Sequence, residues 1–343
     1  MSTPWYQSEL TDKSQILSSR VRLARNIKKY PFQKKLTSKD ATAMVADTKR
    51  AVDRDGNSKL FHQLDIQDLG DTEQKVFLEK HIVSPEFIRG ILPKGLLISD
   101  DHNVSVMINE EDHIRIQSVY PGDGLAEAFE KANQVDDLIE ESIEFAFHAD
   151  YGYLTACPTN VGTGLRASFM IHLPCLDKAD QLKTLVPHIA KFGITIRGIY
   201  GEGTAPMGSI YQISNQRTLG RSEEDIINDL RNVTKNIIDH ENKARDTFLA
   251  TRQEYVEDKV YRAYGILSHC RTISTQEAMN LLSDIRFGFL SELLDVNKPT
   301  KPIYQIMIDI QPGHLQRIEG HDMNDSERDV KRANYLRECF KIQ

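Results

Sequence analysis

The chain has 343 residues and a net charge of −7, with 40% hydrophobic and 27% charged residues. These values are typical of a globular protein, and they argue against a surface that coats nucleic acid. No apolar run approaches the ~18 residues of a membrane span, and the N-terminus shows no secretory signal. The four cysteines are widely spaced and form no CxxC pair, which favours reduced thiols in the cytoplasm.

The first seventeen residues are polar, and we expect them to be only loosely structured. The segment SSRVRLARNIKKYPF follows, in which Arg20 and Arg22 alternate with Val21 and Leu23. A strand here would project both guanidinium groups from one face. Two like charges side by side are unfavourable unless an anion lies between them, although a solvated basic strand edge is the other interpretation.

The hydrophobic pattern predicts the remaining elements. Helical spacing indicates helices over 41–54, within 73–92, and over 124–149 and 176–191. Short alternating or apolar segments predict strands over 96–99, 104–109, 114–117, 165–173, 193–200 and 209–214. Short turns between strands predict antiparallel pairing. From Ser222 onward the pattern is helical, with a second N-cap at Ser274.

These elements predict an α+β fold, a mainly antiparallel sheet flanked by helices and followed by a helical C-terminal domain. We place a short segment at 1–17, a strand-rich catalytic domain at 18–250 and the helical domain at 251–343.

Two segments contain candidate catalytic or binding residues. Residues 109–113 place the carboxylates of Glu110, Glu111 and Asp112 between two predicted strands, where they form either an ordinary turn or a site for a cationic substrate. Residues 157–174 begin with Cys157 and turn through glycines into a strand that starts near Arg166. A Cys/His hydrolase is possible through Cys157, but the sequence assigns no histidine to it.

The common nucleotide and metal motifs are missing. The chain has no GxxxxGK[ST] loop, no HExxH and no Cys/His cluster, and GEGTAPMG has the wrong spacing for a dinucleotide fingerprint. Arginine suits bidentate contact with phosphate because it is permanently charged and fork-shaped. The predicted strands carry five such residues, which suggests a polyphosphate clamp: Arg20, Arg22, Arg115, Arg166 and Arg197.

Four segments, SSRVRLAR, NEEDHIRI, CPTNVGTGLRAS and RGIYGEG, resemble in this order the catalytic segments of the phosphagen kinases, the arginine and creatine kinases. The resemblance covers roughly residues 18–250. Within that superfamily the chain is most similar to the bacterial protein arginine kinases. Only seventeen residues precede the first motif, which leaves no room for the helical N-terminal domain of phosphagen kinases. Residues 328–333, RDVKRA, also match the RDxxRA motif of the protein arginine kinases. Without the family match, these residues would indicate only the charged start of a helix.

The resemblance implies roles for particular residues. The nucleotide would contact His81 and three segments: Ser18, Ser19, Arg20, Val21 and Arg22; Arg115 with Arg166, Ala167, Ser168, Phe169 and Met170; and Arg197, Gly198, Ile199, Tyr200, Gly201 and Glu202. Glu111 and Glu202 would hold the acceptor guanidinium, with Cys157, Glu110, Asn160 and Thr163 beside them. The allosteric phosphoarginine site would comprise Arg328, Asp329, Val330, Lys331, Arg332 and Ala333. Mg²⁺ would be held mainly by the ATP phosphates, without a protein metal site.

One position departs from the phosphagen kinase pattern. Those enzymes usually have a histidine where this chain has Met170, and His172 stands two residues further on. The sequence therefore does not identify the residues that contact the adenine ring of ATP.

We accordingly expect an ATP-dependent kinase of arginine side chains in proteins. The resemblance further implies that it is cytoplasmic, marks proteins for a Clp ATPase–protease in the stress response, controls a heat-shock repressor, works with a zinc-binding activator protein and dimerises through its C-terminal domain. Two alternatives remain: a small-molecule guanidino kinase, and a non-catalytic adaptor that binds phosphoarginine.

Overall fold

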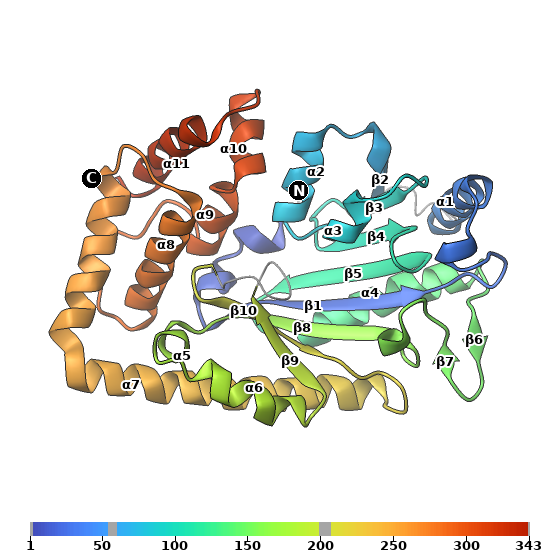
Figure 1. Ribbon diagram of the computed structural model, residues 1–343, viewed down its shortest axis with the longest axis horizontal. Coiled ribbons are helices and arrows are strands. Elements are labelled where there is room, and N and C mark those ends of the chain that lie inside the picture. The colour runs from blue at the N-terminus through green and yellow to red at the C-terminus, as the bar shows by residue number, and fades with distance from the viewer. Residues whose placement is uncertain (1–2, 54–59, 199–206, 342–343) are drawn as a thin grey trace. The chain divides into compact units, whose positions relative to one another are not determined.

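The computed structural model describes residues 3–53, 60–198 and 207–341 (Figure 1). The chain forms two compact units. The first comprises residues 1–5, 19–168 and 214–230, and the second comprises 6–18, 169–213 and 231–343. In the described part of the chain, no helix is both long and apolar enough to cross a bilayer.

Among the described residues, the main sheet has eight strands, in the order β2-β3-β4-β5-β1-β8-β10-β9. The strands β2 to β5 pair antiparallel, with Met107 opposite Arg115 and Ile108 opposite Ile114. The antiparallel sheet that the short turns predict is therefore confirmed. The strand bounds are β1 Ile16–Arg25, β2 Phe61–Asp65, β3 Gly95–Ser99, β4 Val104–Ile108, β5 Ile114–Pro121, β8 Leu165–His172, β9 Ile194–Gly198 and β10 Ile210–Asn215, and a separate hairpin joins β6 Phe147–His148 to β7 Gly152–Tyr153.

The first unit contains the helices α1 (Ser38–Val52), α2 (Asp71–Glu79), α3 (Pro85–Ile88) and α4 (Leu125–Glu140). The helix α4 packs on β5 (Figure 1), and its buried residues recur every three to four positions. It ends nine residues before the predicted boundary at 149, since Phe145 instead forms a β-bridge with Ile27 and the chain continues into β6.

The second unit contains α5 (Pro174–Lys178), α6 (Leu182–Ala190), α8 (Thr275–Leu290), α9 (Ile303–Asp309), α10 (Pro312–Glu319), α11 (Asp325–Cys339) and most of α7 (Glu223–His269). The single helix predicted over 176–191 is wrong: α5 and α6 are separate, and Asp180 between them has a left-handed backbone with φ of 53°. Ser274 caps α8 as predicted, accepting the N–H of Glu277.

The N-terminal segment is better ordered than its polar sequence predicts. It forms the short 3₁₀ helices η1 (Trp5–Gln7) and η2 (Glu9–Asp12), in which Trp5, Tyr6 and Thr11 are buried. Within the second unit, the buried Arg286 donates a 2.7 Å hydrogen bond to the Thr11 carbonyl, and the Asp12 carboxylate accepts the Ile303 N–H at 2.5 Å. A buried cation on a distant helix thus fixes this segment, which local sequence does not reveal.

Candidate functional site

Four of the predicted arginines lie on three neighbouring strands of the first unit. Arg20 and Arg22 are on β1, Arg115 is on β5 and Arg166 is on β8, in the sheet order β5-β1-β8. Along β1 the two arginines are the partly exposed positions, and every other residue of the strand is buried. The alternation in the sequence therefore places both guanidinium groups on one face of the strand, as predicted.

The electrostatics of Arg22 show that these arginines form a cluster. Burial lowers the pKa of Arg22 well below its ordinary value, and the charges of Arg20, Arg115 and Arg166 lower it further. The Nε atom of Arg22 is buried and has no hydrogen-bond partner among the described residues. Like charges gathered in this way are costly unless an anion binds between them, so the arrangement suits a polyphosphate.

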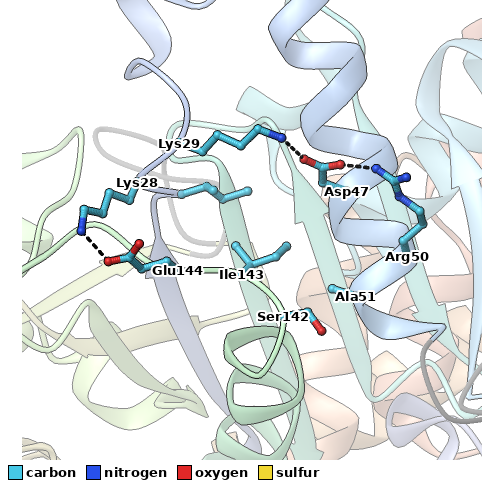
Figure 2. A pocket seen from close by; sticks show the side chains of 9 residues that line it. Lys28, Lys29, Asp47, Arg50, Ala51, Ser142, Ile143 and Glu144 are labelled. Carbon is cyan, nitrogen blue, oxygen red and sulfur yellow. Dashed lines mark hydrogen bonds and ion pairs between the residues drawn. The ribbon is translucent and has the colours of Figure 1, made fainter.

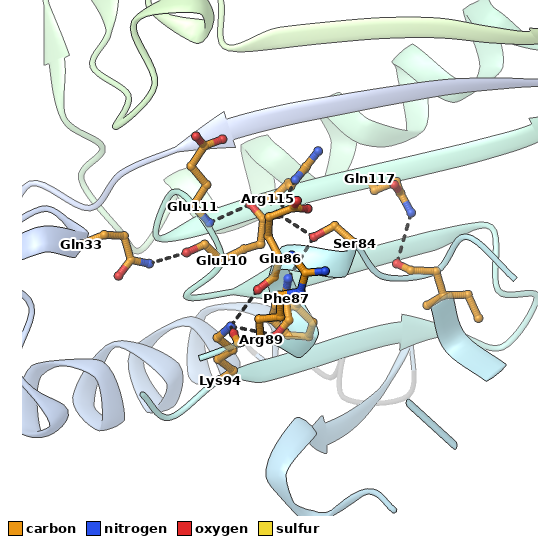
Figure 3. A network of polar contacts seen from close by, with 11 residues as sticks. Gln33, Ser84, Glu86, Phe87, Arg89, Lys94, Glu110, Glu111, Arg115 and Gln117 are labelled. Carbon is orange, nitrogen blue, oxygen red and sulfur yellow. Dashed lines mark hydrogen bonds and ion pairs between the residues drawn. The ribbon is translucent and has the colours of Figure 1, made fainter. Parts of the chain in front are cut away.

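Glu110 supplies the counter-charge of this cluster (Figure 3). Its carboxylate accepts Arg115 Nη1 at 2.5 Å, the Ser84 hydroxyl at 2.5 Å and the Glu111 backbone N–H at 2.7 Å. Burial raises the pKa of Glu110, but Arg115, Ser84, the Glu111 N–H and Arg22 outweigh it and hold the pKa below its usual value. The side chain is 2% exposed, so Glu110 anchors the hairpin between β4 and β5 from inside.

Glu111, the next residue, is the exposed carboxylate of that hairpin. Figure 3 shows its side chain extending away from the contacts that surround Glu110. Partial burial raises the pKa of Glu111, and the charges of Glu110 and Asp112 raise it further, against the opposing effect of Arg115. An accessible carboxylate with a raised pKa beside a cationic cluster can both bind a guanidinium group and accept a proton from it.

Asp112 joins this hairpin to the loop that carries Cys157. Its Oδ1 atom accepts Asn26 Nδ2 at 2.7 Å and the Ala156 N–H at 2.6 Å. The half-buried Cys157 follows at once, with its Sγ 3.1 Å from Thr159 Oγ1. The positioning role of Asn26 and Asp112 was not predicted, although Asp112 belongs to the acidic run that the sequence offers as a candidate site.

The loop around Asn160 and Thr163 depends on a glycine. Gly164 has φ of 66°, and a Cβ there would lie 2.6 Å from the Ala24 carbonyl oxygen. The Thr163 carbonyl accepts Arg25 Nη1 at 3.0 Å, and the Gly164 N–H donates to the Asn160 carbonyl at 3.0 Å. These contacts hold the predicted acceptor residues beside the end of β1.

Arg25 closes the SSRVRLAR segment but has a different role from Arg20 and Arg22. Its guanidinium group contacts Asp136 on α4 at 2.6 Å and lies 3.6 Å from the centroid of the Tyr153 ring. With 2% and 7% exposure, the Arg25 and Asp136 side chains form a buried ion pair that joins β1 to α4.

His81, which is predicted to contact the nucleotide, is part-buried, and the charge of Arg20 in the arginine cluster acts on it. Burial lowers the pKa of His81 to about 3, with a further contribution from the charge of Arg20. The imidazole is therefore neutral near pH 7. Its ring centroid lies 6.4 Å from that of Trp5, and its backbone is left-handed with φ of 57°.

Several predicted nucleotide residues are buried. Ser19 accepts the Gly124 N–H at 3.0 Å and donates to the Gly122 carbonyl at 2.7 Å, so its hydroxyl fixes the start of α4. The remaining buried members, whose side chains pack in the interior, are Ser18, Val21, Ala167, Ser168, Phe169 and Met170.

The second unit holds other predicted positions. Arg197 and Gly198 end β9 and are half-buried, whereas Ile199, Tyr200, Gly201 and Glu202 lie outside the described residues. Met170 is 6% exposed, and its sulfur accepts the Tyr304 hydroxyl at 2.9 Å. His172 is buried between Ser283 Oγ at 2.7 Å and Arg286 Nη1 at 3.0 Å, and burial lowers its pKa well below the usual value.

The RDxxRA-like segment begins α11 in the second unit. Arg332 is 1% exposed and donates to the carbonyls of Ile310 at 3.0 Å and Ile273 at 2.8 Å, and to the Asp329 carboxylate at 2.5 Å. Arg328 contacts the Met323 carbonyl and Asp325. Val330 is exposed, Ala333 is buried, and Lys331 pairs with Glu319. Arg332 and Asp329 thus brace the helix internally, while Arg328 remains part-exposed.

A separate cavity of about 590 Å³ in the first unit contains none of the predicted site residues (Figure 2). Its charged side chains are already paired: Lys28 contacts Glu144, and Asp47 contacts both Lys29 and Arg50. Because these side chains neutralise one another, the cavity offers little net charge to attract a charged ligand.

Comparison with known families matches two models to the chain. ATP:guanido phosphotransferase, C-terminal catalytic domain, covers residues 43–244, and Protein-arginine kinase McsB C-terminal domain covers residues 253–343. Among solved structures, the duplicated taurocyamine kinase from Schistosoma mansoni has a TM-score of 0.63 at 24% identity, over 74% of this chain and 38% of that one. Lombricine kinase has a TM-score of 0.60 at 24% identity, over 71% of each chain. These likenesses show the phosphagen kinase fold.

Curated relatives match over almost the whole chain. The protein-arginine kinase of Caldanaerobacter subterraneus subsp. tengcongensis is 44% identical over 95% of this chain and 96% of its own length. The Bacillus subtilis protein-arginine kinase is 42% identical over 99% of this chain and 93% of its own length. The arginine cluster, the exposed Glu111 carboxylate and these matches agree: the chain belongs to the protein-arginine kinase family.

Proposed function

We propose that this kinase transfers the γ-phosphoryl group of ATP to guanidinium groups of arginine side chains in proteins. The observation that carries the proposal is the juxtaposition of two opposite charge features in the first unit. A cluster of arginines lowers the pKa of Arg22, and the neighbouring hairpin presents Glu111, an exposed carboxylate with a raised pKa. The first suits a polyphosphate donor, and the second suits a cationic acceptor.

The proposal assigns a role to each of these charged groups. Arg20, Arg22, Arg115 and Arg166 bind the phosphates and stabilise the charge that moves during transfer. An acceptor nitrogen attacks the γ-phosphorus in line, the bond to the leaving ADP oxygen breaks, and Glu111 takes the proton of that nitrogen. A guanidinium has a pKa of about 12.5–13.8, so a positioned carboxylate is needed to align it and to receive its proton as the N–P bond forms.

Further residues complete the proposed site. The family resemblance assigns Cys157, Asn160, Thr163 and Glu202 to the acceptor, and it assigns Arg197 to the phosphates. His81 lies on the nucleotide side as a neutral ring. The described residues contain no cluster of three or more His, Cys, Asp or Glu side chains suited to a metal. The family resemblance implies that Mg²⁺ would be held mainly by ATP oxygens, where it would neutralise phosphate charge.

The wider context is also part of the proposal, and it rests on the family resemblance. We place the kinase in the cytoplasm, with a heat-shock repressor among its substrates, a zinc-binding activator protein and a Clp ATPase–protease as partners, and a homodimer contact in the C-terminal domain. The segment Arg328–Ala333 would bind phosphoarginine through the part-exposed Arg328, while Arg332 keeps the helix in place.

The test is to incubate the protein with ATP and an unfolded arginine-rich protein, and to map phosphosites under non-acidic conditions. Acid-labile phosphoarginine should form, and Glu111→Gln should lower its rate by about 10²–10⁴-fold, the range for a general base. Glu86→Gln is the matched control, because Glu86 is another exposed carboxylate whose charge influences Glu111. Acid-stable phosphoserine would refute the proposal. Turnover with free arginine but not with protein would instead identify a small-molecule guanidino kinase, and a cellular phenotype unchanged by Glu111→Gln would favour the adaptor.

A further inference from the structure

A second cavity, of about 320 Å³, lies in the second unit and is separate from the residues assigned above. Its walls come from the helices α5, α7 and α8 (Figure 1). Aromatic rings of Phe248, Tyr255 and Phe287 contribute to the lining. The volume is at the small end of the range for ligand pockets, about 300–1,000 Å³, so the cavity suits a small molecule.

The charged residues of this cavity do not balance. Lys178 Nζ and Lys259 Nζ each lie 2.9 Å from the carboxylate of Asp284, whose side chain is 9% exposed. Asp284 is the only acid among the lining residues, and Arg252 adds a third cation. Three cations facing one carboxylate leave an excess of two positive charges.

Two observations show that this excess is not relieved by the described neighbours. The Arg252 side chain makes no hydrogen bond or ion pair with any residue that the structure describes. Glu241 is not among the lining residues, and its two carboxylate oxygens accept the backbone N–H groups of Cys175 at 2.8 Å and Leu176 at 2.9 Å. Burial and the neighbouring Lys178 lower the pKa of Lys259, as expected for two ammonium groups that share one carboxylate.

The backbone of α7 changes direction at the same place. Arg252 has non-helical dihedral angles, φ −146° and ψ 36°, between Phe248 on one helical segment and Tyr255 on the next. Neither proline nor glycine occurs at residues 248–255, so the sequence supplies no intrinsic helix breaker there. The interruption brings rings from both segments and a cationic residue to one cavity.

We propose that this cavity binds a small phosphate monoester that carries an aromatic or apolar group. A phosphate monoester bears a charge of about −1.5 to −2 at pH 7 and has three acceptor oxygens, which matches the excess of two charges and the three cationic side chains. The aromatic residues pack against the remainder of the ligand. The site is distinct from the arginine cluster on β1, β5 and β8, and the proposal does not depend on the reaction assigned to that cluster.

The experiment uses the full chain and phenyl phosphate as the probe, with binding measured by isothermal titration calorimetry. A saturating non-hydrolysable ATP analogue fills the arginine cluster, so that the probe reports on the second cavity. One equivalent should bind. Arg252→Gln and Lys259→Gln should each weaken binding by about ten-fold to a hundred-fold, as expected for loss of one charge-assisted hydrogen bond.

Matched variants keep the result interpretable. Lys243→Gln removes an exposed lysine of the same helix and should bind as the parent does. The Arg252 side chain makes no hydrogen bond or ion pair with described residues, so its variant should fold, and circular dichroism and thermal melting would verify this.

Three results would overturn the proposal. The first is absence of saturable binding up to millimolar phenyl phosphate in the folded parent protein. The second is equal affinity in the parent, Arg252→Gln and Lys259→Gln. The third is inorganic phosphate or a phosphotyrosyl peptide binding at least ten-fold more tightly than phenyl phosphate, which would contradict a small ligand with an apolar group.

Discussion

The buried pair of Glu110 and Arg115 allows a quantitative test of the arginine cluster. In Glu110→Gln the side chain keeps its shape, but Arg115 loses its carboxylate partner at 2.5 Å and the cluster around Arg22 loses a counter-charge. The two side chains are 2% and 18% exposed. Removing one partner of a buried pair costs about 3–5 kcal/mol, and two unit charges ~4 Å apart interact by about 4 kcal/mol at an effective dielectric constant of 20.

We therefore expect the free energy of unfolding to fall by about 3–5 kcal/mol, which corresponds to about 10 °C in Tm at about 2–4 °C per kcal/mol. The assays are urea unfolding and scanning calorimetry in phosphate-free buffer. Glu144→Gln is the matched control, because its pair with Lys28 is exposed, at 72% and 64%, and should contribute less than about 1 kcal/mol.

The same variant should respond more strongly to anions. Without Glu110 the cluster carries one more uncompensated positive charge, so tripolyphosphate should raise the Tm of Glu110→Gln by more than it raises the Tm of the parent. If the two glutamine variants were equally stable, or if tripolyphosphate stabilised Glu110→Gln no more than the parent, the reading of Glu110 as the counter-charge would be wrong.

Three further outcomes follow from the same contacts. Asp112→Asn should shift the acid limb of kcat/KM to lower pH, because the Asp112 charge raises the pKa of Glu111; an unchanged pH–rate profile would contradict this. The pKa of His81 falls to about 3 in the folded state from 6.5, so the unfolded state binds more protons and the stability should decline as pH falls from 6.5 towards 3. His81→Gln should flatten that decline in urea titrations at successive pH values, and an equal slope in both proteins would count against it. Gly164→Ala should destabilise the loop around Thr163 and lower kcat, because φ is 66° and the new Cβ would lie 2.6 Å from the Ala24 carbonyl oxygen. The control Gly220→Ala, with φ of 73° and no atom within 4 Å of the new Cβ, should lower the free energy of unfolding by only about 1 kcal/mol. Equal losses of stability in the two variants would refute the steric argument.

The sequence predicted the direction of side chains on strands better than it predicted the bounds of helices or the order of the N-terminal segment. Arg20 and Arg22 could be placed on one face because side chains alternate along any strand. The bounds of α4 and the break between α5 and α6 could not be predicted, since Phe145 pairs with Ile27 and Asp180 adopts a left-handed backbone, both of which depend on the surrounding fold. The ordered N-terminal segment was not predicted for the same reason: Arg286, 275 residues further along the chain, donates a hydrogen bond to the Thr11 carbonyl.

The sequence by itself determined the family, the order of the four catalytic segments and the chemical types that the reaction needs, because these depend on residue identity and local spacing. Tertiary structure alone decided which of those residues do structural work. Glu110 and Glu111 are adjacent in the chain, yet one neutralises an arginine inside the protein and the other presents its carboxylate to solvent. Arg332, which belongs to the predicted phosphoarginine motif, is buried and donates hydrogen bonds to the backbone carbonyls of Ile310 and Ile273. Burial and long-range hydrogen bonding distinguish structural residues from accessible site residues, and no local sequence pattern encodes either property.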